Sequence, residues 1–334
     1  MTHKLEQEVA IQAVIGSSKF FDYLKNNNVK IQKIIKQDNS PVTIADYGSQ
    51  IIIMNEILSS FPHDIINSEE NLSLLKHKQS EIDKFTLFDI IRKINPNITI
   101  KQLDRVINNE GSKATRKKRF WVLDPLDGTK GFLRGNQYQY AISLSLIENG
   151  FVKLGVLCCP NLFFKISKQK KYHGCIFIAN RGKGTYIFTL DKYVVQKAHV
   201  NTISNPENAI FCESYEKSHT SHENHNKIAA LLGIKASPIR MDSQCKYALV
   251  SRGDISIYFR LPKKLNSFEK IWDHAAGAII IEESGGKVTD ALGRQLNFTA
   301  GNKLTNNYGV IATNGYLHNK VVEATREILK SSPH

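Results

Sequence analysis

The segment from residue 120 to residue 129, Phe-Trp-Val-Leu-Asp-Pro-Leu-Asp-Gly-Thr, constrains this chain more than any other. Its first four apolar residues predict a buried strand, and the acids, proline and glycine that follow predict a turn. Pro125 fixes its own φ and biases Asp124 away from the helical region, so we expect the strand to end at Asp124. The chain must therefore fold so that a buried strand delivers two carboxylates to one sharp turn.

The two carboxylates of this turn, Asp124 and Asp127, can converge on one point in space. Converging carboxylates repel each other and raise each other's pKa unless a cation lies between them. A hard divalent ion with oxygen ligands would relieve that repulsion, and the backbone N–H groups of Gly128 and Thr129 could hold an anion nearby. These residues alone leave a second interpretation open, an ordinary turn that simply ends a strand.

Length and composition bound the class of protein. At 334 residues the chain exceeds the roughly 250–300 residues at which a single core stops growing, so we expect two domains. No apolar run approaches the roughly 20 residues that cross a bilayer, and the N-terminal residues lack the apolar segment of a signal peptide. The five cysteines form no CxxC pair. These features predict a reduced, cytoplasmic protein without a membrane partner, and they leave access to the nucleus open.

Basic residues are in excess. Lysine and arginine outnumber aspartate and glutamate by 45 to 31, which gives a formal net charge of +14. Such an excess suits either a nucleic acid or small anionic substrates. The densest basic run extends from Lys113 to Arg119, but it contains no aromatic residue for base stacking. We therefore favour a solvated loop there and keep a basic nucleic-acid-binding protein as the alternative of another class.

The N-terminal half mixes helical and strand patterns. A helix is expected over residues 5–24, and a second over 47–58 with Thr43 as its N-cap and Asp46 at the N3 position. Residues 72–119 are typical of polar helices and look like an insertion. The expected strands cover residues 65–66, 120–123, 138–147, 151–159, 175–179 and 185–188.

From about residue 203 strands and helices alternate regularly. The expected order is strand 210–212, helix 223–232, strand 239–241, helix 244–251, strand 255–259, helix 273–284, strand 309–312 and helix 317–330. Alternation of this kind predicts a mixed or parallel sheet covered by helices. We therefore expect an α/β protein, with an α+β domain over residues 1–202 and an α/β domain over residues 203–334.

Five acidic residues stand at predicted helix starts or strand ends: Asp46, Glu70, Asp124, Asp127 and Asp273. Each has an ordinary role available, since Asp46 can cap a helix and Asp273 can complement the dipole of one. As a set, they lie where α/β folds place their functional sites. Oxygen ligands favour Mg²⁺ over zinc, and two such ions can deprotonate a water and neutralise the leaving oxygen of a phosphate ester.

Two motifs resemble a known family. Asp-Pro-Leu-Asp-Gly-Thr at 124–129 and Trp-Asp-His-Ala-Ala-Gly at 272–277 resemble the signature pair of the lithium-sensitive, Mg²⁺-dependent inositol monophosphatase superfamily. The match extends almost end to end with its branch of 3′(2′),5′-bisphosphate nucleotidases, especially the fungal ones. The supporting blocks are residues 38–43, 130–135, 242–247 and 258–262. Six blocks in the right order make chance a poor explanation.

The resemblance implies a layered αβαβα sandwich of the inositol monophosphatase and fructose-1,6-bisphosphatase type. It also implies two or three Mg²⁺ ions and inhibition by Li⁺ and Na⁺. Thr129 would bind the attacking water and Asp46 would hold Thr129, so that the pair accepts a proton. The implied metal ligands are Glu70, Asp124, Asp127, Asp273 and the carbonyl of Leu126.

The same resemblance implies a nucleotide site. The scissile phosphate would lie on the N–H groups of Gly128 and Thr129. The implied substrate-binding residues are His219, Ser243, Lys246, Arg260 and Asp273, with His222 an alternative to His219. The family then predicts removal of the 3′-phosphate from adenosine 3′,5′-bisphosphate (PAP) to give AMP, action on its sulfated relative (PAPS), and a link to sulfate assimilation. We expect a monomer whose partner is this small nucleotide, with no nucleic-acid partner.

The chain departs from the family pattern at one acidic motif. Where the family usually has Gly-Glu-Glu-Ser, this chain has Ser68-Glu69-Glu70-Asn71, and the second acid is the one assigned to the metal. An inositol or sugar phosphatase of the same superfamily is the alternative enzyme. It would not need the set Ser243, Lys246 and Arg260, so their presence argues against it.

Overall fold

The computed structural model describes residues 3–29, 31, 33–36, 41–76, 84–109, 118–165, 171–191, 195–216, 220–262 and 267–331. Its α-helices are α1 (Lys4–Asn26), α2 (Ile44–Ser60), α3 (Lys84–Ile94), α4 (Ile100–Ile107), α5 (Thr129–Arg134), α6 (His222–Leu231), α7 (Cys245–Ser251), α8 (Ala275–Glu283) and α9 (His318–Ser331). Short 3₁₀ helices are η1 (Leu72–Lys76), η3 (Pro206–Asn208) and η5 (Ile271–Asp273).

The strands form two main sheets and a small hairpin. They are β1 (Lys33–Ile35), β2 (Pro41–Thr43), β3 (Ile66–Ser68), β4 (Arg119–Asp127), β5 (Ala141–Glu148), β6 (Phe151–Lys165), β7 (Lys171–Asn180), β8 (Gly184–Thr189), β9 (Val195–Lys197), β10 (Phe211–Ser214), β11 (Ile239–Met241), β12 (Ile257–Arg260), β13 (Lys287–Thr289) and β14 (Val310–Thr313). The helices and strands expected from periodicity are confirmed, with ends that differ by a few residues.

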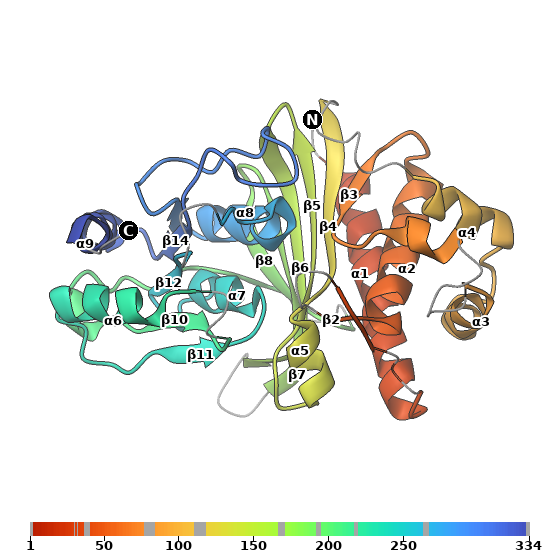
Figure 1. Cartoon of the computed structure of the whole chain (residues 1–334), viewed down its shortest axis with the longest axis horizontal. Coiled ribbons are helices and arrows are strands. Elements are labelled where there is room, and N and C mark those ends of the chain that lie inside the picture. The colour runs from red at the N-terminus through yellow and green to blue at the C-terminus, as the bar shows by residue number, and fades with distance from the viewer. Residues whose placement is uncertain are drawn as a thin grey trace.

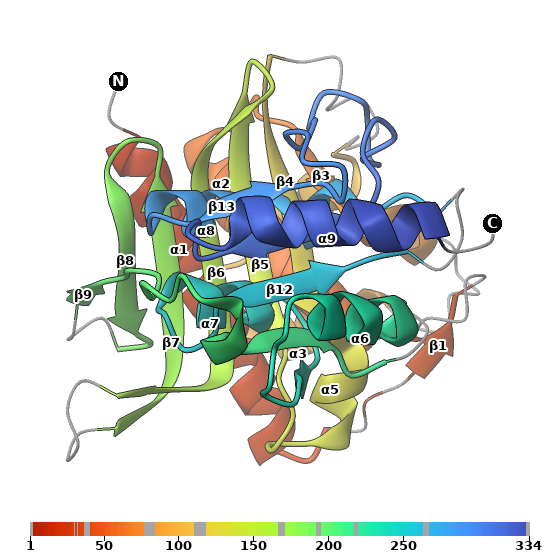
Figure 2. The same cartoon turned by 90° about the vertical axis from the view of Figure 1, so that its left-hand side faces the viewer.

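These elements stack in layers of helix, sheet, helix, sheet and helix (Figure 1). Helices α1 and α2 cover the outer face of the first sheet, and α7 and α8 lie between the two sheets. Helices α6 and α9 run side by side over the outer face of the second sheet (Figure 2). The arrangement confirms the expected αβαβα sandwich.

The larger sheet has seven strands in the order β3-β4-β5-β6-β7-β8-β9. Strands β3 and β4 are parallel, and the later neighbours are antiparallel. In β4, Trp121 and Leu123 pack toward α1 and α2, whereas Phe120 and Val122 pack toward the inner helix layer. Because both faces of β4 are buried, the strand is apolar at successive positions rather than at alternate ones.

Strand β4 does not end at Asp124, as Pro125 predicts, but continues to Asp127. Its pairing with β5 shifts by one residue between Asp124, which lies opposite Ser143, and Asp127, which lies opposite Ala141. This β-bulge tolerates the proline because the ladder hydrogen bonds are already interrupted there. In a regular strand, residues three apart point to opposite faces, so the bulge explains how both acids line one pocket.

The smaller sheet has the order β11-β10-β12-β14-β13. Strand β10 is parallel to both β11 and β12. The chain passes from β10 to β11 through α6 on the outer face, and from β11 to β12 through α7 on the inner face. The connection that leaves β10 leads to β11 at one edge of the sheet, whereas the connection that leaves β12 passes through α8 to β13 at the other edge. The chain therefore diverges between β10 and β12, and α/β folds bind ligands beyond the carboxyl ends of the strands at such a switch point. The two sheets fall on either side of the boundary expected near residue 202, which stays a prediction.

The basic run is not simply a solvated loop. Residues 110–117 lie outside the described residues, but Arg119 belongs to β4, and its guanidinium contacts three carboxylates. It lies 3.1 Å from Glu6, 3.0 Å from Asp64 and 2.7 Å from Glu148. This arginine ties α1 to the edge of the larger sheet, so at its last position the basic run is structural.

The remaining parts of the chain support this framework. Helices α3 and α4 of the insertion pack on α1 and α2 at one end of the sandwich (Figure 1). All five cysteines are buried and none forms a disulfide. Among the described helices, none combines the length and the apolar character that crossing a membrane requires.

Candidate active site

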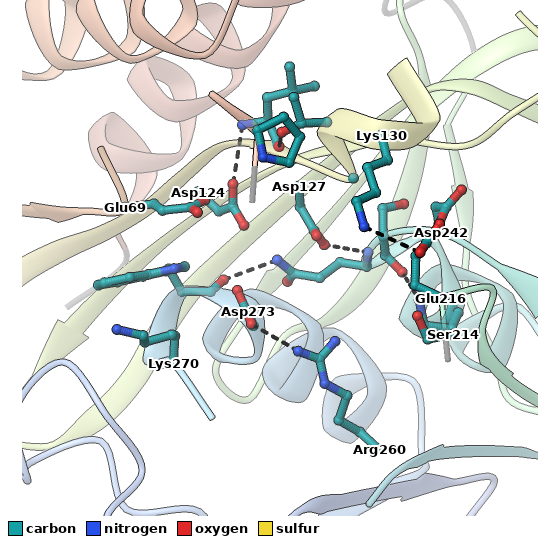
Figure 3. Close-up of a pocket in the computed structure, with 18 of the residues that line it drawn as sticks. Glu69, Asp124, Asp127, Lys130, Ser214, Glu216, Asp242, Arg260, Lys270 and Asp273 are labelled. Carbon is teal, nitrogen blue, oxygen red and sulfur yellow. Dashed lines mark hydrogen bonds and ion pairs between the residues drawn. The ribbon is translucent and has the colours of Figure 1, made fainter. Parts of the chain in front are cut away.

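A pocket of about 710 Å³ opens where the two sheets meet, at the ends of β3, β4, β10 and β12. Figure 3 shows the carboxylates of Glu69, Asp124, Asp127 and Asp273 directed toward one space. Two cationic side chains, Lys246 from α7 and Arg260 from β12, line the same pocket. The pocket therefore contains both a cluster of carboxylates and cationic groups.

We call Glu69, Asp124 and Asp127 the acidic wall. The parallel register of β3 and β4 pairs Ser68 with Leu123, which places Glu69 beside Asp124 one step further along. The N–H of Glu69 donates to the carbonyl of Leu123 at 3.1 Å and extends the pairing to this point. Asp127 accepts a 2.6 Å hydrogen bond from the N–H of Gln244 and so joins the end of β4 to the start of α7.

The acidic wall carries more negative charge than its protein partners balance. Burial raises the pKa of Asp124 well above its usual value, and the neighbouring charges of Glu69, Asp127 and Asp273 raise it further. Burial also raises the pKa of Asp127, against the opposing effect of Lys246 and Arg260. Carboxylates that raise each other's pKa in this way are an oxygen-rich site for a divalent cation, and their donor set fits Mg²⁺.

The predicted pair of Asp46 and Thr129 is brought together. Asp46 lies at the N3 position of α2 and completes a capping box with Thr43, whose N–H and hydroxyl both donate to Oδ2 at 2.7 Å. The second carboxylate oxygen, Oδ1, accepts the hydroxyl of Thr129 at 2.9 Å. Burial raises the pKa of Asp46 to about 6, although the bonds from Thr43 and Thr129 oppose the shift.

A tight turn positions Thr129 and the backbone beside it. Gly128 adopts a left-handed conformation, with φ of 89°, as the N-cap of α5. A Cβ at this position would lie 3.0 Å from Cβ of Ser243 and 3.2 Å from the carbonyl of Gln139, so both conformation and space require glycine. The carbonyl of Leu126 lies 3.2 Å from the Thr129 hydroxyl and lines the same pocket with Gly128.

The structure does not bring Glu70 into this pocket, contrary to the prediction, and places Glu69 there instead. The carboxylate of Glu70 turns away from Asp124 and accepts a 2.5 Å bond from Lys36. Its backbone is held on both sides by Gln50, at 3.1 Å and 2.8 Å. Register decides between the two acids, because one step along β3 exchanges the directions in which neighbouring side chains point.

Asp273 lines the pocket, but it precedes the helix rather than opening it. It ends the 3₁₀ helix η5, and α8 begins at Ala275. Its Oδ2 accepts from Arg260 at 3.3 Å, and Arg260 also donates to Glu269 at 3.0 Å. The ligand atoms of Glu269, Asp273 and His274 lie within 4.8 Å of one another. Glu269 and His274 are already engaged, because His274 bonds both Glu269 and Tyr247.

We call Ser243, Lys246 and Arg260 the basic wall. Lys246 is only 2% exposed, and its ammonium donates to the carbonyls of Met241 at 3.0 Å and Ser243 at 2.5 Å. Burial lowers its pKa, and Asp127 opposes that shift. Burial also disfavours the charge of Arg260, but Glu269 and Asp273 hold its pKa above the usual value. Each cation of the basic wall thus has protein partners before any ligand arrives.

Two histidines were predicted as alternatives for a contact with the nucleotide, and the structure describes one of them. His219 lies outside the described residues. His222, its alternative, opens α6, and its Nε2 lies 2.9 Å from the carbonyl of Ser214. His222 is not among the residues that line the pocket.

Several pocket residues escaped sequence reasoning. Lys36 reaches from the β1–β2 hairpin to Glu69, at 2.9 Å. Glu216 and Asp242 face the pocket and are held there by Arg134, and Lys130 also lies 3.3 Å from Glu216. For Glu69, the pair of acids at 69–70 was a signal visible in the sequence. The positions of Lys36, Glu216 and Asp242 depend on contacts between distant loops and could not be read from the sequence.

Comparison with protein families gives a match over nearly the whole chain. A model described as "Inositol monophosphatase family" matches residues 3–330. A protein of Schizosaccharomyces pombe named 3′(2′),5′-bisphosphate nucleotidase is 37% identical, over 100% of this chain and 98% of its own length. A Dictyostelium discoideum protein of the same name is 37% identical over 97% of each chain. An Arabidopsis thaliana protein named 3′(2′),5′-bisphosphate nucleotidase 1 is 42% identical over 77% of this chain and 79% of its own.

Solved structures agree on the fold. The extragenic suppressor protein SuhB of Bartonella henselae aligns with a TM-score of 0.66 at 20% identity, over 97% of this chain and 99% of its own. An inositol monophosphatase of Thermotoga maritima aligns with a TM-score of 0.62 at 22% identity, over 94% of each chain. At such identities the likeness speaks for the fold alone.

Proposed function

The chain belongs to the inositol monophosphatase family, and from this premise we propose that it removes the 3′-phosphate of adenosine 3′,5′-bisphosphate, which yields AMP and phosphate. The observation that carries the proposal is one pocket that is lined by both the acidic wall and the basic wall. The first suits a metal-assisted phosphate ester hydrolysis, and the second suits a substrate with another negative charge. The names of the relatives in yeast, slime mould and plant support the same reaction.

Enzymes of this family depend on metal, and the ion proposed here is Mg²⁺, in two or three sites. Glu69, Asp124, Asp127, Asp273 and the carbonyl of Leu126 would hold it, with Glu69 in place of Glu70. When bound, divalent ions lower the pKa of a coordinated water and neutralise charge on the leaving oxygen. Inhibition by Li⁺ and Na⁺ belongs to the same proposal.

Asp46 and Thr129 serve proton transfer. The hydroxyl of Thr129 donates to Oδ1 of Asp46 at 2.9 Å, so its oxygen is free to accept a proton from the attacking water. As the water loses its proton to Thr129 Oγ1, the Thr129 proton moves to Asp46. A carboxylate whose burial raises its pKa to about 6 is suited to a base that works near neutral pH.

The backbone N–H groups of Gly128 and Thr129 bind the scissile phosphate at the start of α5. Gly128 allows that approach because no Cβ stands between the backbone and the pocket. Ser243, Lys246 and Arg260 bind the second phosphate and the nucleoside, together with Asp273 and His219. The planar guanidinium of Arg260 suits the two oxygens of a phosphate. The rest of the proposal is a cytoplasmic monomer that also accepts PAPS.

A phosphate-release assay on adenosine 3′,5′-bisphosphate, inositol monophosphate and fructose 1,6-bisphosphate, each titrated with Mg²⁺ and Li⁺, tests this function. The expected result is Mg²⁺-dependent release from the nucleotide, suppressed by Li⁺. Preference for inositol monophosphate would instead favour the sugar phosphatase alternative. Release from none of the three would overturn the proposed reaction.

A further inference from the structure

Strands β10 and β12 stop pairing with each other just before they reach the pocket. Their pairing ends at Cys212 opposite Tyr258. Beyond that point β10 is paired only on its other side, where Glu213 lies opposite Arg240 in β11. The next residues of the two strands toward the pocket include Ser214 and Arg260, which both line it. The width of the crevice between the strand ends is therefore not set by backbone hydrogen bonds between them.

A buried histidine bridges this gap. His225, from α6, is fully buried, and its Nδ1 lies 2.7 Å from Oε2 of Glu213, at the end of β10. Its Nε2 lies 3.0 Å from the hydroxyl of Thr220. The imidazole also stacks on Phe259 of β12, with 5.1 Å between the ring centroids and 29° between the planes. One side chain thus contacts both diverging strands.

The bridge ends on the residue that follows Arg260. The hydroxyl of Thr220 accepts a 3.0 Å bond from the N–H of Leu261. The carbonyl of Leu261 accepts from the N–H of Ser221 at 3.0 Å, so both backbone groups of this residue are engaged. A continuous chain of hydrogen bonds therefore runs from the end of β12 to the end of β10.

The charges of the groups fix the direction of this chain. Burial works against the charge of Glu213, but hydrogen bonds from His225 and Arg240 lower its pKa, so the carboxylate is ionised and only accepts. Burial lowers the pKa of His225, so the ring is neutral and carries one proton. That proton must lie on Nδ1, which donates to Glu213, and Nε2 then accepts from Thr220. The Thr220 hydroxyl has a second acceptor within reach, the carbonyl of Leu261 at 3.1 Å, so its single proton is shared between the ring and that carbonyl.

We propose that His225 is a positioning residue for nucleotide recognition, which holds the ends of β10 and β12 at the separation that the substrate requires. The proposal rests on the proposed function, because it takes the second phosphate and the nucleoside to lie between Ser214 and Arg260. His225 does not line the pocket. It acts through the placement of Glu213 and Leu261, and so of their pocket-lining neighbours.

A second buried histidine supplies a matched control. His318, at the start of α9, is 2% exposed and also has two buried hydrogen-bond partners, the hydroxyls of Thr289 and Thr313, each at 3.0 Å. It packs on the same sheet from α9 and joins β13 and β14, and neither it nor its partners line the pocket. Loss of either histidine removes two buried hydrogen bonds. Only His225 contacts both β10 and β12, so only its loss affects the crevice between these strands.

The experiment compares His225→Phe with His318→Phe. Phenylalanine keeps an aromatic ring in each place and removes both hydrogen bonds. Both variants should have a lower thermal midpoint, and the fall should be larger for His225→Phe because the buried carboxylate of Glu213 loses a donor. Only His225→Phe should raise KM for adenosine 3′,5′-bisphosphate, by about tenfold, with kcat changed less than about twofold. Thr220→Val should raise KM in the same way, and Thr220→Ser, which keeps the hydroxyl, should restore it.

Equal KM values in the two histidine variants, or a Thr220→Val variant with wild-type KM, would overturn the positioning role. If His225→Phe does not fold, the valine and serine variants at Thr220 decide the matter by themselves. A wild-type enzyme that fails to release phosphate from the bisphosphate would overturn the proposed function first. The two failures are therefore distinguishable.

Discussion

The acidic and basic walls face the same pocket but differ in how their charges are met. In the acidic wall, Asp124 has an acidic neighbour on either side, and burial and repulsion raise its pKa. In the basic wall, Lys246 donates to two carbonyls and Arg260 to two carboxylates. Without a bound cation the carboxylates of the acidic wall repel one another, whereas the cations of the basic wall already have hydrogen-bond partners in the protein.

This difference indicates a division of labour. Groups whose charges are unmet gain most when a ligand supplies the missing cation, so the acidic wall is the place for chemistry. Groups held in position by their own partners lose little freedom on binding, so the basic wall suits recognition. Changes in the acidic wall should therefore affect turnover, and changes in the basic wall should affect affinity and preference.

The largest expected effect is that of Asp124→Asn. The change removes one ligand of the proposed cation, and phosphate release at saturating Mg²⁺ should fall by at least about 10³-fold, since metal stabilisation is worth several kcal/mol and each 1.4 kcal/mol is tenfold. The variant also loses a repelling buried charge, so its thermal midpoint without metal should be no lower than that of the wild type. Near-normal turnover in a folded variant would remove Asp124 from the chemistry.

Thr129→Ala should have the next largest effect. It removes the hydroxyl that joins water to Asp46, and kcat should fall by about 10²-fold, the lower end of what a proton acceptor contributes. Thr129→Ser, which keeps the hydroxyl, is the matched control and should keep most of the activity. If serine and alanine are equally slow, the methyl group matters rather than the proton path.

Arg260→Ala should change preference more than turnover. The loss of this cation should raise KM for the bisphosphate by about tenfold or more and alter the KM for adenosine 3′-monophosphate much less, since only the first substrate carries the second phosphate. Arg294→Ala is the control, because Arg294 pairs with Asp290 at 2.7 Å but does not line the pocket. Equal losses on both substrates would show that Arg260 does not read the second phosphate.

The smallest effect on kinetics is expected from Glu269→Gln, whose main consequence is a change in stability with pH. Arg260 and His274 hold the pKa of Glu269 at about 2, although burial opposes them. Because this pKa is below the unfolded value, the stabilisation is present above about pH 4.5 and is lost as pH falls toward 2; it amounts to roughly 3 kcal/mol. Thermal melts at pH 7 and pH 3 should show a smaller acid-induced loss in the variant. Parallel losses would contradict this pairing.

Much of the active site and of the fold could be predicted from local sequence. The capping box of Thr43 and Asp46 and the strand before Asp124 depend on neighbours within a few residues, so they were predictable. The layered architecture followed from the regular alternation after residue 203 and from the family motifs. These features do not depend on how distant strands align.

The register of the strands and the contacts between distant loops could not be predicted from the sequence. Whether Glu69 or Glu70 faces Asp124 is decided by the pairing of Ser68 with Leu123, which no local pattern encodes. The bulge at Pro125 likewise exists only because β5 pairs on both sides of it. The partners of the basic wall, such as Glu269 for Arg260, come from a loop that reaches back to the strand.

The most direct test of the division of labour is the ratio of kcat/KM for adenosine 3′,5′-bisphosphate to that for adenosine 3′-monophosphate, measured on the wild-type enzyme at saturating Mg²⁺. Both substrates present the same scissile phosphate to the acidic wall, and only the first offers a second phosphate to the basic wall. The ratio should be about 10 or greater, consistent with a charge contact worth 1.4 kcal/mol or more. A ratio near one would contradict the assignment of recognition to the basic wall.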